Sequence, residues 1–286
     1  MEINPTSTQK FAPKLPTSSH LRGRVVVVTG STQGIGLIMA QSLAAAGANI
    51  VVCSRSDASV EAACANLSVP EKQILGMTCD VTDLGQVEHL AKKTIERFGQ
   101  IDVWFNNAAV NRSFGPALDV PVEQWHEVIH TNLNGTYHGT MTALQHMLRR
   151  NQGKIINLLG AGAQDSPGDS YLCAYATSKA AARRFTLVVA EDYRKTGVSI
   201  LGMNPGLFST QLTTQIQPLN DEARRRMKFL DFGLRWLATS PQNIAKTAVR
   251  IASDATNGQT GKIYRCWPGV STALQREYRK LRQEQP

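Results

Sequence analysis

Short apolar runs alternate with helical patterns along most of this chain. The first run, Val25–Val28, is β-branched, and residues 35–46 follow it with an alanine-rich helical pattern. The other predicted strands are Asn49–Cys53, residues near 73–79, Ile101–Phe105, Lys154–Leu159, Val198–Met203 and Lys262–Cys266. The other predicted helices are residues 57–67, 83–98, 121–150, 172–195 and 241–254. Nearly continuous apolar strands of this length are typical of a sheet covered on both faces.

Strands that alternate with helices predict right-handed crossovers and a parallel sheet. The fold class is therefore α/β, a doubly wound Rossmann-type sheet of about seven strands with helices on both faces, which binds ligands at the carboxyl ends of its strands. We expect a flexible arm over 1–20, a single domain over 21–268 and a helical extension over 269–286. No linker or internal repeat interrupts the pattern.

Composition narrows the function classes further. The chain has 286 residues, of which 42% are apolar, and no apolar run approaches the roughly 20 residues that span a bilayer. The first twenty residues lack the apolar region of a secretory signal, and the net charge of +9 is spread along the chain, so we expect a cytoplasmic protein that does not bind nucleic acid. Five widely spaced cysteines argue against a disulfide framework and against a metal site.

A glycine-rich turn follows the first strand and opens the first helix. It comprises Gly30, Ser31, Thr32, Gln33, Gly34, Ile35 and Gly36. Glycines let a backbone approach a pyrophosphate, and a helix N-terminus offers free N–H groups to it. A glycine run alone is weak evidence, but a strand before it and a helix after it are the context of a dinucleotide site.

The end of the second strand distinguishes NAD from NADP. An acidic residue there would bind the ribose hydroxyls, whereas a basic residue would accept the 2′-phosphate. The strand ends in Ser54, Arg55 and Ser56, with no acid before Asp57. Arg55 can pair with a phosphate through two N–H groups, so the sequence favours NADP(H) over NAD(H). The alternative is that Arg55 is a solvated loop residue.

Asp80 and Val81 end the third predicted strand. A carboxylate at this edge can accept a hydrogen bond from the adenine amino group, or it can cap the next helix. The two roles are not exclusive.

Tyr175 and Lys179 lie four residues apart on a predicted helix and therefore share a face. A nearby ammonium favours the phenolate and lowers the pKa of a tyrosine. Such a tyrosine can give a proton to a carbonyl oxygen or take one from an alcohol. The pair alone is common by chance, and its alternative is a surface contact.

Four motifs in order resemble those of the short-chain dehydrogenase/reductase family, of the classical type. Thr29–Gly36 resembles its TGxxxGxG, Asn106–Ala109 its NNAG with alanine last, Tyr175–Lys179 its YxASK, and Asn204-Pro205-Gly206 with Thr210 its PGxxxT segment. The resemblance covers residues 22–268.

The resemblance implies roles for individual residues. Tyr175 would be the general acid/base, Lys179 would hold the nicotinamide ribose, and Asn132 would sit at a helix kink and hold a water of the proton relay. Asn107, Ala108 and Ala109 would line the adenosine-ribose side. The nicotinamide carboxamide would meet Pro205, Gly206, Leu207 and Thr210.

One position departs from the family pattern. A serine usually follows the fifth strand and binds the reacting oxygen, but Gly160 stands there, followed by Ala161. Ser166 or Ser170, a backbone N–H, a water or the substrate itself could replace it. The Gly-Ala-Gly segment is similar to that of chlorophyll b reductases, which is consistent with a bulky, hydrophobic substrate. A generic reductase that drifted at this position is the alternative.

Residues 206–240 correspond to the family's substrate lid. Phe208 and other apolar residues there, with Gly160, Ala161 and Ser166, are candidate substrate contacts, and Arg224–Arg226 with Lys228 would suit an acid group on the substrate. The family assembles through helices that correspond to 121–150 and 172–195, so the resemblance implies a homodimer or homotetramer. We expect an NADP(H)-dependent oxidoreductase that interconverts a carbonyl and an alcohol. The alternative is a non-catalytic NADP-binding regulatory or scaffold protein.

Overall fold

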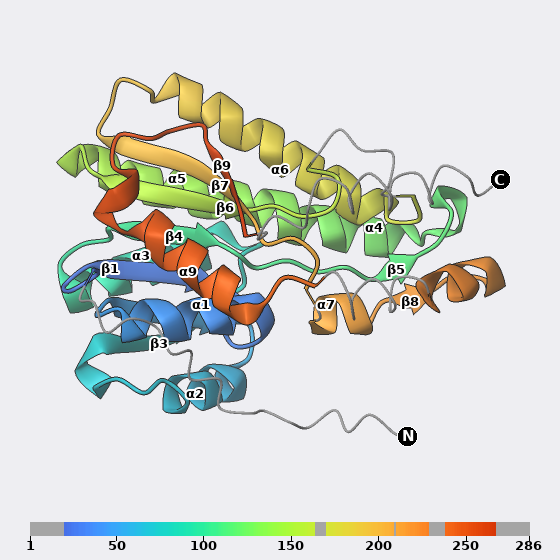
Figure 1. The fold of residues 1–286 in the computed structure, drawn as a ribbon, viewed down its shortest axis with the longest axis horizontal. Helices are drawn as coiled ribbons and strands as arrows, with labels where there is room; N and C mark the ends of the chain where they lie inside the picture. Colours follow the sequence, from blue (N-terminus) through green and yellow to red (C-terminus); the bar gives the residue numbers. More distant parts are fainter. Residues whose placement is uncertain (1–19, 164–169, 209, 229–237, 267–286) are drawn as a thin grey trace.

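A seven-stranded parallel sheet forms the centre of the computed structural model, which describes residues 20–163, 170–208, 210–228 and 238–266 (Figure 1). The strand order is β3-β2-β1-β4-β6-β7-β9. Its strands are β1 (Val25–Thr29), β2 (Asn49–Ser54), β3 (Ile74–Thr78), β4 (Val103–Asn106), β6 (Gly153–Leu158), β7 (Val198–Asn204) and β9 (Ile263–Arg265). The order reverses between β1 and β4, so the predicted doubly wound sheet is confirmed.

Helices cover both faces of this sheet (Figure 1). They are α1 (Gly34–Ala45), α2 (Asp57–Ala65), α3 (Leu84–Phe98), α4 (Val122–Ile129), α5 (Gly135–Arg150), α6 (Cys173–Asp192), α7 (Gln211–Thr214) and α9 (Pro241–Ala252), and residues 221–228 are also helical. Each predicted strand and each of the main predicted helices is present, with ends that differ by at most three residues.

Local chemistry explains several helix ends. Asp83 and Ser240 accept hydrogen bonds from the first turns of α3 and α9, as N-cap side chains do, and Pro241 occupies the first turn of α9. The last turn of α3 is closed by Gly99 at φ 84°, a left-handed conformation that favours glycine. These signals set the lengths of the crossovers and hence the register of the sheet.

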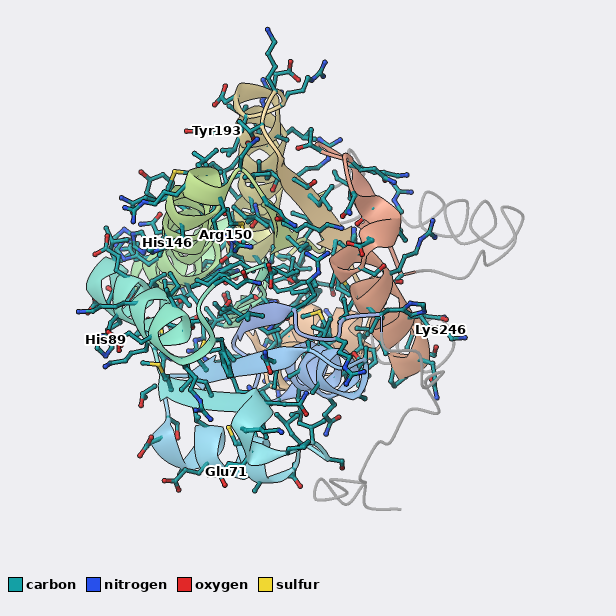
Figure 2. All side chains as sticks on the ribbon, turned by 90° about the vertical axis from the view of Figure 1, so that its left-hand side faces the viewer. Glu71, His89, His146, Arg150, Tyr193 and Lys246 are labelled. Atoms are coloured by element: carbon teal, nitrogen blue, oxygen red, sulfur yellow. The ribbon has the colours of Figure 1, made fainter. Side chains whose placement is uncertain are left out.

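Two apolar clusters hold the layers together. One face of the sheet packs against α1, α2 and α9 around buried residues such as Leu43, Ile156 and Ile244. The other face packs against α3, α5 and α6 around buried residues such as Trp104 and Ile200. Exposed side chains such as Glu71, His89 and Lys246 lie on the outer surfaces (Figure 2). The core therefore fixes the strands from both sides and leaves their carboxyl ends to carry loops.

Two features departed from the predicted pattern. The predicted helix over 121–150 contains a π-helical turn, His130–Asn134, between α4 and α5. The predicted irregular segment 206–240 contributes β8 (Gln217–Pro218), which pairs with β5 (Ser113–Phe114) in a small separate sheet. Strands of two residues lie below what an alternating pattern can reveal, which is why β5 and β8 were missed.

Cys53, Cys64, Cys79, Cys173 and Cys266 are all free, and Cys53 and Cys79 are buried core residues as predicted. Within the described part of the chain, no helix is long and apolar enough to cross a membrane. The described residues also contain no cluster of three or more His, Cys, Asp or Glu side chains that could hold a metal ion.

Truncation of a buried strand residue tests this core. Ile200 is fully buried on β7, so we expect Ile200→Ala to lower the free energy of unfolding by about 2–5 kcal/mol, because the removed atoms leave a cavity. Urea denaturation followed by circular dichroism measures it. Leu118→Ala is the control, since Leu118 is 96% exposed, and it should change stability by less than about 0.5 kcal/mol. Equal effects of the two variants would contradict this packing.

Candidate active site

The glycine-rich turn after β1 is shaped by close backbone contacts. Gly30 has φ 62°, and a Cβ on it would lie 2.9 Å from the Cα of Ala108. A Cβ on Gly36 would lie 2.3 Å from the carbonyl oxygen of Gly30 and 2.5 Å from the amide nitrogen of Asn107. Real Cβ atoms do not come so close, so glycine is required at both positions. The turn is thereby folded tightly against the segment that follows β4.

The first turn of α1 has no side-chain cap. Its N-cap residue, Gln33, makes no capping hydrogen bond, whereas Ser56, Asp83 and Ser240 cap α2, α3 and α9. The N–H groups at the start of α1 are therefore available to an outside acceptor. Together with the positive end of the helix dipole, they suit a phosphate.

Asn107 and Thr29 hold the glycine turn in place. The Asn107 side chain donates to the carbonyl oxygens of Thr29 and Gly30 at 2.8 and 3.0 Å. The Thr29 hydroxyl accepts from the backbone N–H groups of Asn107 and Ala108. Asn107 and Ala108, predicted to line the cofactor, thus lie directly beside the turn, and Ala109 follows them.

The residues that follow β2 lie at the same edge of the sheet, the one formed by the carboxyl ends of the strands. The Ser31 hydroxyl accepts from the Cys53 N–H, and the Ser31 N–H donates to the Cys53 carbonyl, so Ser31 is buried by its tie to β2. The Ser54 hydroxyl bonds the Ser56 backbone. The Ser56 hydroxyl caps α2. Both serines at the end of β2 are therefore already engaged in shaping the local backbone.

Arg55 is exposed between these two serines, and its positive charge acts on Glu127 of α4. The pKa of Glu127 lies below its usual range, chiefly because Arg112 donates hydrogen bonds to it, and Arg55 adds a smaller electrostatic effect. Arg112 and Glu127 already form a two-pronged ion pair. Arg55 forms no ion pair with a described residue, which leaves its guanidinium available to an anion at the mouth of the site.

Asp80 closes the turn after β3. One of its oxygens accepts from the Thr82 N–H at 2.9 Å and from the Thr82 hydroxyl at 2.8 Å. The helix cap that sequence reasoning considered for Asp80 belongs to Asp83 instead. Val81 is buried against Gly135, and its carbonyl oxygen lies 2.9 Å from Nδ1 of His138. The second carboxylate oxygen of Asp80 is therefore the candidate acceptor for a hydrogen bond from the adenine amino group.

The segment after β7 folds back over the glycine turn. Gly206 has φ 77° and donates its N–H to the Asn204 side chain. A Cβ on Gly34 would lie 3.0 Å from Cγ2 of Thr210. The strap after β7 (Pro205–Phe208 with Thr210), which includes Leu207, thus meets the start of α1 through Thr210. Phe208 is partly buried against the main apolar core, so part of its side chain packs the strap onto the fold.

Lys179 lies beneath Tyr175 on α6. It is only 2% exposed, its Nζ donates to the Leu158 carbonyl at 2.8 Å, and Nζ lies 5.9 Å from the centroid of the Tyr175 ring. Burial lowers the pKa of Lys179 to about 8. The hydrogen bond to Leu158 ties α6 to the end of β6, so tyrosine and lysine face the carboxyl edge together.

Asn132 lies in the π-helical turn and is fully buried. Its Oδ1 accepts from the Val110 N–H, and its Nδ2 donates to the Val110 carbonyl and to the Ser178 hydroxyl. Ser178 in turn donates to the Tyr175 carbonyl at 2.7 Å. The helix distortion implied by the resemblance is present. The Asn132 side chain connects the loop after β4 to α6.

Gly160 and Gly162 bring the loop after β6 against the start of α6. A Cβ on Gly160 would lie 2.6 Å from the Tyr175 hydroxyl oxygen. Gly162 has φ 85°, and a Cβ on it would lie 2.1 Å from the Ala176 carbonyl oxygen. A side chain at either position would displace α6 or the tyrosine. The space next to Gly160 is therefore filled by the tyrosine itself.

Phe114 and Tyr171 form an aromatic wall that sequence reasoning missed. Their ring centroids lie 5.4 Å apart, Tyr171 has φ 71°, and the Arg226 guanidinium lies 4.5 Å above the Tyr171 ring. Ile216 and Ala223 complete this cluster. A positive φ in a tyrosine costs energy, and residues in such conformations cluster at functional sites. No periodic pattern marks such a residue, since the contact depends on loops far apart in the sequence.

The basic residues of the lid are paired within their own helix. Arg224 lies near Asp221, and Arg225 and Arg226 both bond Glu222. The positive charge predicted to meet an acidic substrate group is therefore largely neutralised locally.

A buried polar network beneath the site was also missed. The Asn106 side chain donates to Thr140 and to Asn157 and accepts from Trp104, and Asn157 donates to Thr186 on α6. These bonds lock β4, β6, α5 and α6 together. Asparagines at strand ends were the only available signal, and sequence reasoning assigned one of them only to a motif.

Some predicted features lie outside the described residues. They are Ser166, the arm over 1–19, the extension after residue 266 and the lid aromatics between 229 and 237. Ser170, the other proposed replacement for the serine, is exposed at the turn before α6. Ala161 is partly buried beside Gly160.

Comparisons with known proteins agree with this geometry. The family model "short chain dehydrogenase" matches residues 24–221. The 3-oxoacyl-(acyl-carrier-protein) reductase of Haemophilus influenzae is 30% identical over 242 residues, which cover 84% of this chain and 95% of that protein. Gluconate 5-dehydrogenase of Gluconobacter oxydans is 27% identical over 260 residues, 91% of this chain and 99% of that protein.

A third relative and a solved structure extend the picture. A probable chlorophyll(ide) b reductase of Arabidopsis thaliana is 31% identical over 207 residues, which cover 66% of this chain but only 42% of that protein. The crystal structure of levodione reductase has a TM-score of 0.76 and 27% identity, covering 86% of this chain and 96% of that one. The chain therefore belongs to the short chain dehydrogenase family, whose members are oxidoreductases that use nicotinamide cofactors.

Proposed function

We propose that this protein is an NADP(H)-dependent oxidoreductase that interconverts a carbonyl and an alcohol, with Tyr175 as general acid/base. The observation that carries the proposal is the buried Lys179 ammonium beneath the Tyr175 ring, on the same sheet edge as the uncapped start of α1. A positive charge at this distance favours the phenolate and thereby makes Tyr175 a better proton carrier near neutral pH.

The residues at the sheet edge fit a phosphorylated dinucleotide. Free N–H groups at the start of α1 and the glycine turn, which leaves no side chain in the way, suit its pyrophosphate. Asp80 keeps one carboxylate oxygen for the adenine side. Arg55, exposed and without an ion pair among the described residues, suits a 2′-phosphate, and no acid stands at the end of β2 to bind the ribose hydroxyls of NAD.

The proton path uses three of the chain's own side chains. A nicotinamide cofactor supplies or accepts the hydride when it is bound. Tyr175 gives its hydroxyl proton to the carbonyl oxygen during reduction and takes a proton back from the alcohol during oxidation. Lys179 stabilises the phenolate that remains. Asn132 holds the Val110 backbone and, through Ser178, the first turns of α6, so it keeps Tyr175 in position.

The substrate side suits a bulky, hydrophobic compound. Tyr171, just before α6, is partly exposed beside the buried Phe114, and Gly160 adds no side chain beside the Tyr175 hydroxyl. The probable chlorophyll(ide) b reductase among the relatives has a name consistent with a large, flat substrate. The pairing of the lid arginines with Asp221 and Glu222 does not favour an acid group on that substrate.

We also propose that the protein forms a homo-oligomer. Tyr137 on α5 and Val188 on α6 are exposed apolar side chains on the two helices expected to form the interface. Tyr137 packs against Phe185 of α6, so the two helices share one apolar outer face.

Removal of the Arg55 guanidinium tests the cofactor preference. Because a charge-assisted pair with a phosphate contributes about 1.5–3 kcal/mol, Arg55→Ala should weaken NADPH binding by roughly 10- to 100-fold and leave NADH binding unchanged. Fluorescence titration of each nucleotide measures this. Arg194→Ala is the matched control, since Arg194 is exposed and, among the described residues, forms an ion pair with Glu191 alone. Unchanged NADPH affinity would disprove the role of Arg55.

Removal of the Tyr175 hydroxyl separates the enzyme from its alternative. Tyr175→Phe should lower kcat about 100- to 10,000-fold, because proton transfer loses its donor, while NADPH binding persists. Steady-state assays against a panel of ketones and aldehydes measure it. A non-catalytic NADP-binding scaffold, which the unusual Gly160 leaves as the second candidate, would instead show no turnover in the wild type and an unchanged partner function in the variant.

Addition of a methyl group at Gly160 tests how Tyr175 is placed. The new Cβ would lie 2.6 Å from the tyrosine oxygen, so Gly160→Ala should push the hydroxyl aside and reduce kcat about 100-fold, as small misplacements of reacting groups do. Gly85→Ala on α3 is the control, since its Cβ would be no closer than 3.3 Å to any atom. Equal activity of the two variants would contradict the close contact.

The pKa of Lys179 predicts how stability depends on pH. Burial lowers it from 10.5 to about 8, so between these values the unfolded chain binds a proton that the folded chain releases, and stability rises with pH. The free energy of unfolding of the wild type relative to Lys179→Met should therefore grow between about pH 8 and 10 and stay flat below. Urea denaturation over this range measures it, and parallel curves for the two proteins would refute a buried, depressed lysine.

A further inference from the structure

A pocket lies at the amino ends of the parallel strands, at the opposite edge of the sheet from the candidate active site. Residues at the starts of β1, β4, β6 and β7 line one side, and the segment after α9 lines the other. Its volume is about 200 Å³, several times the roughly 30 Å³ that one water occupies in the liquid. The space is therefore large enough for a small ligand of several heavy atoms.

Lys154 brings a buried positive charge to this pocket. It is 6% exposed, and its Nζ donates to the carbonyl oxygens of Ile251 and Ser253 and to the Thr256 hydroxyl. These acceptors are neutral, and no carboxylate of a described residue lies within 4.0 Å. Buried charges in proteins are normally paired, so Lys154 lacks a counter-ion here.

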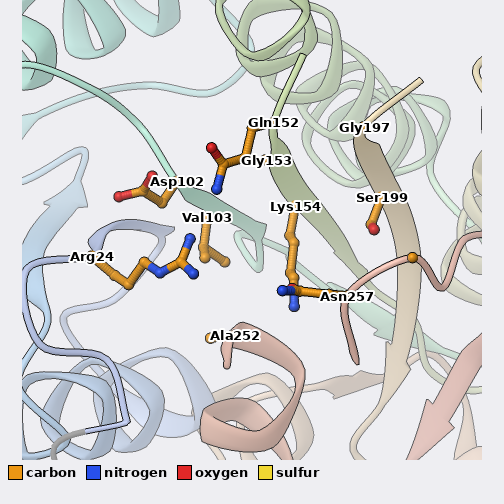
Figure 3. Close-up of a pocket in the computed structure, with 11 residues that line it drawn as sticks. Arg24, Asp102, Val103, Gln152, Gly153, Lys154, Gly197, Ser199, Ala252 and Asn257 are labelled. Atoms are coloured by element: carbon orange, nitrogen blue, oxygen red, sulfur yellow. The ribbon is translucent and has the colours of Figure 1, made fainter. Parts of the chain in front are cut away.

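The other charges around the pocket cancel in pairs. Arg24 forms an ion pair with Asp254. Asp102 accepts from the Val25 N–H, from Gln100 and from Arg150, and its carboxylate turns away from the centre of the pocket (Figure 3). The pairs Arg24–Asp254 and Arg150–Asp102 leave Lys154 as the uncompensated charge. The pocket is therefore electropositive.

Two hydrogen-bond donors face the same space. Ser199 is 5% exposed on β7 and lines the pocket, and its hydroxyl makes no hydrogen bond with any described residue. Arg24 uses only Nη2 on Asp254, and both Arg24 and Lys154 line the pocket (Figure 3). Among the described residues, the fully buried side-chain atoms without a partner do not include the Ser199 oxygen, so this hydroxyl is accessible and can donate to a ligand in the pocket.

We propose that this pocket is a binding site for a small oxyanion, a phosphate- or carboxylate-type group, held by Arg24 and Ser199 and neutralising Lys154. An oxyanion accepts hydrogen bonds from both donors at once and supplies the missing counter-charge. No described carboxylate inside the pocket opposes it, since Asp102 is already satisfied by three donors.

The electrostatics of Lys154 agree with this assignment. Burial lowers its pKa to about 8, Asp254 acts in the opposite direction, and Arg24 lowers it further. The ammonium is thus destabilised in the ligand-free protein. A bound anion would remove that penalty, so binding stabilises the folded state as any ligand specific for it does.

This site is independent of the proposed oxidoreductase activity. The strand β6 begins at the pocket with Gly153 and Lys154 and ends at the active-site edge with Leu158, whose carbonyl binds Lys179. No residue that lines the pocket belongs to the candidate active site. Failure of one proposal therefore leaves the other standing.

Thermal unfolding and calorimetric titration of the full-length protein test the proposal. Inorganic phosphate, sulfate, acetate and succinate are each titrated against sodium chloride at matched ionic strength. For the best oxyanion we expect saturable binding and, at about one hundred times its Kd, a rise in Tm of roughly 5 °C or more. Preference for phosphate and sulfate over acetate and succinate, or the reverse, identifies which type of group the pocket takes.

Three variants locate the binding. Ser199→Ala and Arg24→Gln should each weaken oxyanion binding by about tenfold or more, and Lys154→Met should abolish the Tm shift. If Lys154→Met fails to fold, oxyanion binding by Ser199→Ala and Arg24→Gln still tests the proposal. NADPH affinity should be unchanged in each folded variant. Shifts equal to those in sodium chloride, or equal in wild type and variants, would overturn the proposal.

Discussion

The contact on which the candidate site depends is the one between the loop after β6 and the first turns of α6. Gly160 and Gly162 lack the atoms that would separate loop and helix, so the Tyr175 hydroxyl and the Ala176 carbonyl come within van der Waals distance of that backbone. The hydrogen bond from Lys179 to the Leu158 carbonyl then holds α6 against the end of β6. The close approach of α6 to the loop after β6 thus depends on two glycines in this chain.

The start of α1 combines two features that suit an anion. Ser56, Asp83 and Ser240 bind the first N–H groups of α2, α3 and α9, whereas α1, α4 and α6 begin without a side-chain cap. At α1 the uncapped N–H groups follow a glycine turn in which Gly30 and Gly36 have no space for a side chain. The turn and the helix start together leave backbone donors that an anion can reach.

The order of strands and helices could be predicted because each run of buried strand is apolar and each crossover has its own caps and glycines. The motif residues Tyr175, Lys179 and Asn132 also came together at one edge of the sheet, since parallel strands share that edge. What sequence could not supply were contacts between loops. The Arg226–Tyr171 stack, the Asn106–Asn157 network and the internal pairing of the lid arginines depend on distances that no periodic pattern encodes.

The π-helical turn between α4 and α5 changes the direction in which the later side chains of this long helix point. One residue more than an α turn advances every later side chain by about 100° around the axis. The segment before the turn packs on α6, and the segment after it packs on α3 and β4. The turn thus rotates the packing face of the helix between α4 and α5. An uninterrupted α-helix with this sequence could pack against either set of neighbours but not both. In a redesign of this fold, the extra residue of the π-helical turn would therefore have to be kept.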